Sequence, residues 1–342
     1  MSTSPLSAPI SRRSLFRAGL GVGATALVGI PILAACGSDS AASDDGTVSA
    51  QTGWVPTVEQ AGTYVAATNG YFTSRGINVD ILAGGPNTAV DTVVVSGKAA
   101  LGNGNADAVA EMITNGADVK VIGSRFQRSP FCVYSLSDKA VTDPTQMVGK
   151  KIGVAAQNEA PFRVLCAINN VDVDDLTIVP VQFDPAPTAN GEVDAQVGFL
   201  IDQPATLRAQ GLDVNTILFS DFGYNVFSSV WFATTETIET RPDMLVSFLG
   251  GERQGWQENL KDPALGARLA VDVYGKNTGL DLAQQTLASQ SIESLMVTPE
   301  VPAADILTMT DAQISSNIAT LKSVGLDISA EQLFDTSILA QL

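Results

Sequence analysis

The sequence predicts an α/β protein of two lobes, each built on a largely parallel β-sheet. Short apolar segments alternate with helical segments over residues 47–219, as in an α/β unit. The alternation restarts after Asp143-Pro144 and Gly149, which indicates a second unit. Apolar, β-prone segments at 129–136 and 227–234 lie at the junctions, where the chain is expected to cross between units. Two lobes with two crossings favour a hinged arrangement, with a cleft facing the carboxyl ends of the strands.

The first unit is expected to alternate four strands with three helices. Thr57 caps the first helix and Asn69-Gly70 ends it. Gly84-Gly85-Pro86 turns the chain from the second strand into a helix that ends at Val95. We expect the strands at 48–51, 77–82, 99–102 and 119–123, and the other helices at 57–68 and 105–114.

The second unit repeats this pattern, and a helical region follows it. We expect its strands at 151–155, 177–181, 194–199 and 216–219, and its helices at 160–169 and 204–210. Later helices are expected at 242–249, 265–274, 281–289 and 311–324. Lobe 1 is then expected to comprise residues 47–138 and 226–342, and lobe 2 residues 139–225.

The N-terminal residues have the pattern of an export signal. A twin-arginine segment, Ser11-Arg12-Arg13-Ser14-Leu15-Phe16, precedes an uncharged run and the lipobox Leu33-Ala34-Ala35-Cys36. An uncleaved membrane helix over 18–35 is the alternative, but its glycines, Pro31 and the closing cysteine favour a signal. We expect a signal peptide at 1–35, and a lipidated Cys36 and flexible tether at 36–46. The protein is then exported and held at the outer face of the cell membrane, or in a periplasm, by lipid alone.

Composition excludes several classes of function. The formal net charge of −17 makes nucleic acid an improbable partner. The chain contains no histidine, which removes Ser-His-Asp and Cys-His catalysis and histidine-containing zinc sites. We expect a monomeric protein that is not an enzyme and that holds no cofactor or metal.

Cys132 and Cys166 are the two cysteines left once Cys36 carries lipid. An exported protein permits a disulfide between them. Separate burial as two apolar thiols is the alternative that we favour, because nothing in the sequence sets their distance.

Ten short segments match one known family in their order and spacing. They begin with Trp54-Val55-Pro56 and end with Asp221-Phe222-Gly223-Tyr224-Asn225. The full set lies at 54–56, 59–66, 69–72, 76–79, 96–99, 125–130, 149–153, 191–195, 202–204 and 221–225. With these segments the chain resembles the substrate-binding proteins related to the thiamine-pyrimidine-precursor family.

The resemblance implies a periplasmic-binding-protein-like (type II) fold that serves an ABC importer, with the membrane permease as its partner. Such relatives bind aminopyrimidines, flavins, sulfonates, taurine or nitrate, so the ligand stays open. Asp202-Gln203-Pro204 stands where the pyrimidine binders carry Asn-Glu-Pro, and Arg128 replaces a histidine. An amide has one acceptor and two donors where a carboxylate only accepts, so the ligand is expected to differ from a plain aminopyrimidine.

Residues after the predicted strands are the candidates for the cleft. Trp54 is placed to stack on a planar ligand, or else to pack in the core. Backbone N–H groups of the glycine-rich loops at 84–87 and 102–105 are expected to face the cleft, although such loops are also ordinary turns. The candidate ligand-binding residues are Trp54, Gln60, Gly85, Asn87, Asn103, Asn105, Phe126, Gln127, Gln157, Asn158, Asp202, Gln203, Tyr224 and Asn225.

The leading hypothesis is a lipid-anchored receptor that captures a small planar polar nutrient, such as a vitamin-type heterocycle, by hinge closure. The alternative is a receptor for a small anion, either a sulfonate, taurine or nitrate, held by helix N-termini and by Arg125 or Arg128. An exported enzyme is a weaker reading, because no nucleophile–base pair is visible.

Overall fold

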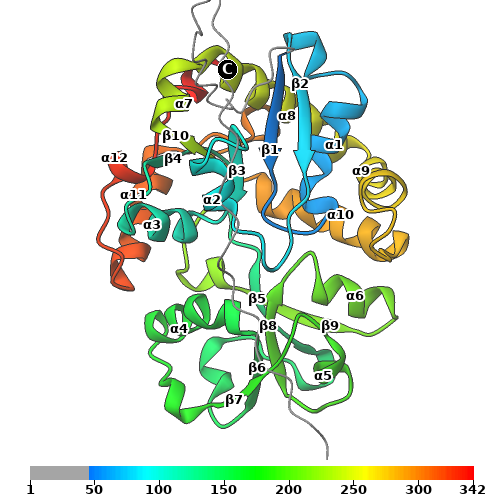
Figure 1. The fold of residues 1–342 in the computed structure, drawn as a ribbon. Helices are drawn as coiled ribbons and strands as arrows, with labels where there is room; N and C mark the ends of the chain where they lie inside the picture. Colours follow the sequence, from blue (N-terminus) through cyan, green and yellow to red (C-terminus); the bar gives the residue numbers. More distant parts are fainter. Residues whose placement is uncertain (1–45) are drawn as a thin grey trace, which may run out of the picture. The chain divides into compact units, whose positions relative to one another are not determined.

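Residues 46–342 are described by a computed structural model, in which they form two five-stranded β-sheets with helices around them (Figure 1). The signal peptide expected at 1–35, Cys36 and nearly all of the tether lie outside the described residues. Within 46–342, no helix combines the length and the apolar character that a membrane crossing needs. The α/β class predicted from the sequence is confirmed.

The first sheet has the strand order β2-β1-β3-β10-β4. β1 is parallel to β2 and β3, whereas β10 is antiparallel to β3 and β4. Ala50 of β1 pairs with Leu101 of β3, and both are fully buried. The strands are β1 (Thr47–Gln51), β2 (Asn78–Leu82), β3 (Leu101–Gly104), β4 (Val119–Phe126) and β10 (Ser228–Thr234).

The second sheet, drawn in green in Figure 1, has the order β7-β6-β8-β5-β9. β6 is parallel to β7 and β8, and β5 is antiparallel to β8 and β9. Both sheets therefore follow one plan, in which an antiparallel strand separates the third and fourth strands of the unit. The strands are β5 (Phe131–Leu136), β6 (Lys151–Val154), β7 (Thr177–Pro180), β8 (Ala195–Phe199) and β9 (Val214–Leu218).

The two segments expected at the crossings are the antiparallel strands themselves. β5 belongs to the second sheet, so the expected lobe boundary after residue 138 is wrong, and the chain crosses between Phe126 and Phe131. It crosses back between Leu218 and Ser228. β5 and β10 are buried along nearly their whole length, and each lies inside a sheet with a neighbour on both sides.

Most helices begin and end close to the expected positions. The exceptions are α2, which begins four residues after Pro86, α8 and α10, which continue past their expected ends, and the short helices α5, α7 and α12, which were not expected. The helices are α1 (Ala61–Thr68, preceded by the 3₁₀ turn η1, Val58–Gln60), α2 (Val90–Val95), α3 (Ala106–Thr114), α4 (Glu159–Ile168), α5 (Ala186–Ala189), α6 (Gln203–Ala209), α7 (Thr235–Thr240), α8 (Pro242–Lys261), α9 (Pro263–Leu269), α10 (Leu282–Met296), α11 (Asp311–Ser323) and α12 (Ala330–Leu333).

Helix α8 passes through glycines that suggest a helix end after Leu249. A Cβ atom on Gly255 would lie 2.0 Å from the carbonyl oxygen of Gly62, and one on Gly62 would lie 2.3 Å from the Trp256 ring. These glycines therefore let α1 and α8 pack at a distance that larger residues forbid. The packing outweighs the cost of about 1 kcal/mol for a glycine inside a helix.

Candidate ligand-binding site

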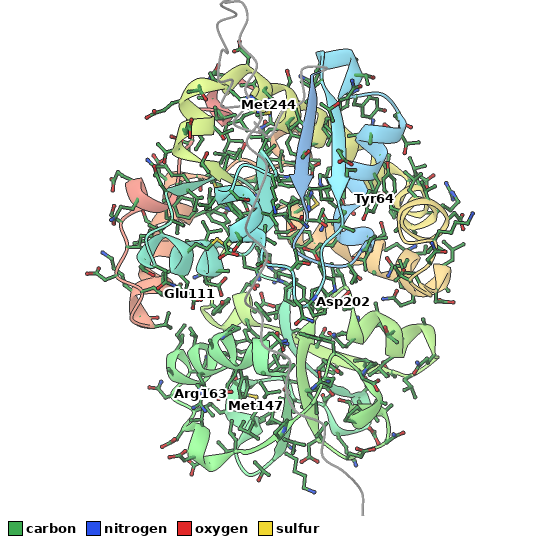
Figure 2. All side chains as sticks on the ribbon, viewed as in Figure 1. Tyr64, Glu111, Met147, Arg163, Asp202 and Met244 are labelled. Atoms are coloured by element: carbon green, nitrogen blue, oxygen red, sulfur yellow. The ribbon has the colours of Figure 1, made fainter. Side chains whose placement is uncertain are left out.

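A cavity of about 200 Å³ lies between the two lobes, at the level of Asp202 in Figure 2. Many of its lining residues end or follow β1, β3, β6, β7 and β8, so it lies at the carboxyl ends of parallel strands. Lobe 1 contributes Gly53, Trp54, Glu59, Asn103, Gly104 and Asn105, and lobe 2 contributes Phe131, Gln157, Asn158, Phe183, Phe199, Asp202 and Gln203.

Aromatic side chains form two walls of the cavity. Trp54 of lobe 1 and Phe183 of lobe 2 meet edge to face, with ring centroids 5.0 Å apart. Phe131 and Phe199 meet in the same way at 4.6 Å. Aromatic faces favour a planar, π-rich ligand.

Close contacts between two loops position Trp54. The Gly84 N–H donates to the Trp54 carbonyl at 3.1 Å, and Thr52 Oγ1 donates to the same oxygen at 3.3 Å. A Cβ on Gly84 would lie 2.2 Å from the Thr52 carbonyl oxygen, so only glycine permits this approach. The Trp54 backbone is thus tied to the loop that follows β2.

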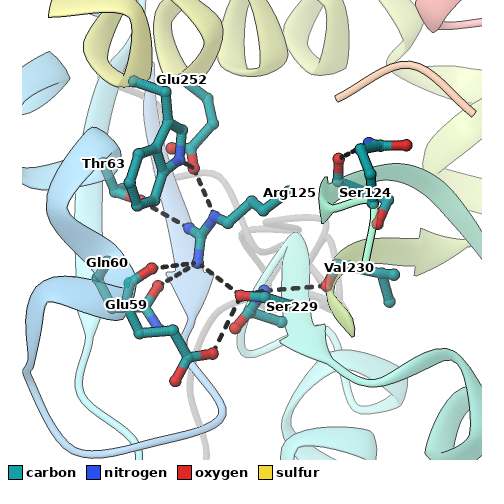
Figure 3. A network of polar contacts seen from close by, with 11 residues as sticks. Glu59, Gln60, Thr63, Ser124, Arg125, Ser229, Val230 and Glu252 are labelled. Carbon is teal, nitrogen blue, oxygen red and sulfur yellow. Dashed lines mark hydrogen bonds and ion pairs between the residues drawn. The ribbon is translucent and has the colours of Figure 1, made fainter. Parts of the chain in front are cut away.

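Glu59 presents a carboxylate to the cavity from the 3₁₀ turn η1. Ser229 Oγ donates a hydrogen bond to Glu59 Oε1 at 3.0 Å, and Arg125 Nη1 donates to Ser229 Oγ at 3.3 Å (Figure 3). Burial raises the pKa of Glu59, while the positive charge of Arg125 and the Ser229 hydrogen bond oppose that rise. Ser229 has a backbone φ of 52°, in the left-handed region that non-glycine residues rarely occupy.

Arg125 is fully buried behind Glu59 and does not line the cavity. Arg125 Nε lies 2.7 Å from Glu252 Oε1, to which Trp256 Nε1 also donates at 2.9 Å. Its Nη2 donates to Thr63 Oγ1 at 2.7 Å, and its guanidinium carbon lies 4.5 Å from the Trp231 ring centroid. The Arg125 charge is therefore neutralised within lobe 1, contrary to the expectation that it holds an anionic ligand.

Asp202 presents the second carboxyl group, from the residue before α6 in lobe 2. Burial and the neighbouring Glu59 charge raise the pKa of Asp202 to about 7. Among the described residues, none that lines the cavity is a lysine or arginine. The cavity is therefore acidic on both sides.

The amide side chains of the cavity are already partly engaged. Gln203 Oε1 accepts from the Phe199 N–H at 3.0 Å, which leaves its second lone pair and its two Nε2 donors for a ligand. Asn103 Nδ2 donates to the Val230 carbonyl at 3.0 Å, and Asn105 Oδ1 accepts from the Ser229 N–H at 3.3 Å. These amides mainly hold the walls in place.

Half of the candidate residues line the cavity and half do not. Those that line it are Trp54, Asn103, Asn105, Gln157, Asn158, Asp202 and Gln203. Those that lie elsewhere are Gln60, Gly85, Asn87, Phe126, Gln127, Tyr224 and Asn225.

Five of the candidate residues that do not line the cavity have other contacts or lie in another groove. Gln60 accepts from Arg125, and Phe126 is fully buried at the end of β4. Gln127 and Asn225 line a separate groove. Tyr224 Oη donates to Asp107 Oδ2 at 3.0 Å.

Sequence reasoning missed Glu59 and three aromatic residues, Phe131, Phe183 and Phe199. Two signals were available. Glu59 lies two residues after the cap residue Thr57, where a helix begins beside the end of β1, and Phe183 is the one aromatic residue of a polar loop after β7. In the sequence, nothing distinguishes Phe131 and Phe199 from ordinary apolar residues of a strand.

Other charged and sulfur-containing candidates also lie outside the cavity. Arg128 pairs with Asp221 near the second crossing. Cys132 and Cys166 are free thiols buried in lobe 2, and burial raises the pKa of Cys166 to about 11.

The chain is similar to two proteins named for the small molecules they bind and to one named as a synthase. The riboflavin-binding protein RibY of Chloroflexus aurantiacus is 24% identical over 61% of this chain and 61% of its own length. The formylaminopyrimidine-binding protein of Halalkalibacterium halodurans is 24% identical over 69% and 74%, respectively. The 4-amino-5-hydroxymethyl-2-methylpyrimidine phosphate synthase of Schizosaccharomyces pombe is 25% identical over 62% and 65%. This chain thus spans less than two thirds of the first and third relatives.

Solved structures share the fold. The periplasmic aliphatic sulphonate binding protein SsuA of Escherichia coli superposes with a TM-score of 0.64 at 13% identity, over 85% of this chain and 92% of that one. The likeness establishes the two-lobed periplasmic-binding-protein fold expected from the sequence. The family model described as "NMT1/THI5 like" matches residues 57–265, more than half of the chain. The chain therefore belongs to the NMT1/THI5-like family.

Proposed function

We propose that this protein is the substrate-binding component of an ABC importer and that it captures a small planar heterocycle of the pyrimidine or flavin type. The observation that carries the proposal is the cavity between the lobes, where aromatic walls and polar groups come from both sides. The riboflavin-binding and formylaminopyrimidine-binding relatives, named for ligands of this class, support it.

Capture is proposed to proceed by closure of the lobes around the ligand. Trp54 and Phe183 come from different lobes, so a ring bound between the walls contacts both. A ligand that contacts both lobes stabilises the closed arrangement, which is the form the permease would distinguish from the empty receptor.

A small anion is a poorer fit to this cavity. Its described lining contains two carboxyl groups and no basic side chain, and both arginines considered for the role are paired elsewhere. A sulfonate or nitrate would face like charge. An enzymatic role like that of the synthase relative has less support, because the chain has no histidine to act as an acid or base.

Export and anchoring complete the proposal. The twin-arginine segment and the lipobox at 33–36 support a lipoprotein on the outer face of the membrane, acting as a monomer beside its permease. Cys36→Ser is expected to release or misprocess the protein. Unchanged membrane fractionation of this variant would contradict the anchor.

A thermal-shift screen tests the ligand class. The protein is heated with aminopyrimidines, riboflavin, alkanesulfonates, taurine and nitrate, since a bound ligand raises the unfolding temperature by mass action. We expect a rise with pyrimidines or flavins and none with the anions. A rise with a sulfonate alone would overturn the proposal.

A further inference from the structure

The two carboxyl groups of the cavity are supported very differently. Glu59 accepts from Ser229, which Arg125 supports in turn. Among residues 46–342, no hydrogen bond is donated to the Asp202 carboxyl; only its backbone is engaged. The Asp202 N–H donates to the Phe199 carbonyl at 2.9 Å, and the Asp202 carbonyl accepts from Thr206 Oγ1 at 3.0 Å and Gln284 Nε2 at 3.4 Å. The Ser229 hydrogen bond and the Arg125 charge thus favour the ionised form of Glu59 against the effect of burial, whereas the Asp202 carboxyl has no such donor within the described residues.

The charged groups described around Glu59 and Asp202 provide no positive charge for the Asp202 carboxyl. Arg125 is bonded to Glu252, and the next ionisable group toward the adjoining groove is another acid, Asp281. Asp281 caps α10 by accepting from the Gln284 N–H at 2.7 Å. The neighbouring charge that acts on Asp202 is that of Glu59, and it opposes the ionisation of the Asp202 carboxyl.

Resting on the proposed function, we propose that the ligand is a heteroaromatic ring that is cationic when bound, with Glu59 and Asp202 as its counter-charges from opposite lobes. The aromatic walls support such a ring, because a cation is attracted to an aromatic face. A neutral ring would leave two carboxyl groups in one small cavity with no opposite charge.

Proton balance distinguishes two sources of the cation. The pKa of Asp202, raised to about 7, means that the empty site holds a proton in about half of the molecules at neutral pH. A ring with a fixed positive charge displaces this proton to solvent. A neutral ring base instead takes the proton onto a ring nitrogen, and little or none is released.

The affinity test uses one matched pair of probes and one matched set of variants. The probes are 4-amino-5-hydroxymethyl-2-methylpyrimidine and its N-methylated cation, titrated calorimetrically at about pH 8, where the parent ring is neutral. We expect the cation to bind at least about tenfold more tightly, the factor that 1.4 kcal/mol corresponds to. Glu59→Gln and Asp202→Asn should each remove most of this preference, while Glu258→Gln, outside the cavity on α8, should keep it.

A second measurement needs no variant. Titration of the N-methylated cation near pH 7 in two buffers of different ionisation enthalpy should report a released proton. Equal affinity of the two probes, or no proton release, would overturn the cationic ligand while the proposed function stands if either ring binds. Binding of an alkanesulfonate with no heterocycle bound would overturn both.

Discussion

The two lobes follow the same strand plan but contribute to the cavity in different ways. In lobe 1, Glu59 belongs to a buried network that runs through Ser229 and Arg125 to Glu252 (Figure 3). In lobe 2, Asp202 and Phe183 come from loops, and the described protein donates nothing to the Asp202 carboxyl. The difference indicates that lobe 1 holds its part of the binding site in place before a ligand arrives. In lobe 2, the ligand itself would supply the missing partner of Asp202.

Replacing Arg125 should have the largest effect on the buried network that distinguishes lobe 1 from lobe 2. Arg125→Met leaves Glu252 buried without its counter-charge, and we expect a loss of about 3–5 kcal/mol in the free energy of unfolding. Urea denaturation measures it. The matched control is Arg128→Met, which breaks a partly exposed pair and should cost no more than about 1 kcal/mol. Equal losses in both variants would contradict a preorganised lobe 1.

Trp54→Ala tests the wall that joins the lobes. The variant loses the contact with Phe183 and the surface on which a ring stacks, so ligand binding should weaken by about 2–3 kcal/mol. Calorimetry with a heterocycle found by the screen measures this change. Phe199→Leu, confined to the lobe 2 wall, should cost less; the reverse order would argue against Trp54 as the principal stacking surface.

The pH dependence of stability sharpens the comparison on the lobe 2 side. Because the folded-state pKa of Asp202 is raised to about 7, the folded protein binds an extra proton between the unfolded value of about 3.9 and 7. This group therefore makes the ligand-free protein less stable as pH rises through that range. Asp202→Asn should flatten this slope and raise stability by about 1–2 kcal/mol above pH 7. Urea midpoints measured from about pH 5 to 8 test it, and an unchanged slope would count against the raised pKa.

Ser229 is expected to give the smallest effect. Ser229→Ala removes the hydrogen bond to Glu59 and should weaken binding of a cationic or N–H-rich ring by about 1 kcal/mol. Ser229→Gly also removes the hydroxyl but suits the left-handed backbone, so it should bind as weakly as Ser229→Ala while being more stable. Parent-like binding by both variants would show that Glu59 needs no support from this hydroxyl.

Local patterns predicted the elements of this fold better than its long-range pairing. Thr57, Asn69-Gly70 and the apolar runs placed β1, η1 and α1 within a few residues. The local sequence does not show that β5 inserts into the second sheet, because an apolar crossing segment and a buried central strand have the same sequence pattern. The helix end predicted at Leu249 was wrong for a related reason, because the glycines of α8 pack closely against residues far away in the chain, Arg75, Phe72 and Gly62.

Residues of the candidate site could be predicted where they lie at or just after the carboxyl ends of strands. Trp54, Asn103 and Gln157 follow or end strands and were found. Gln60 has the same polar character as its neighbour Glu59, but it points to Arg125, and only the three-dimensional network reveals this. Phe131 and Phe199 were missed because side chains that line a cavity and side chains that fill a core share one chemistry.

The strand order also has a consequence for biosynthesis. The five strands of the second sheet lie in one continuous stretch, 131–218, whereas the first sheet needs β10 after the whole of that stretch. On the ribosome, the second sheet can therefore close while the first still lacks a central strand, although the first began earlier. The N-terminal half of lobe 1 must wait with an unpaired edge at β3 and β4, which makes that half the part of the nascent chain most in need of chaperone cover.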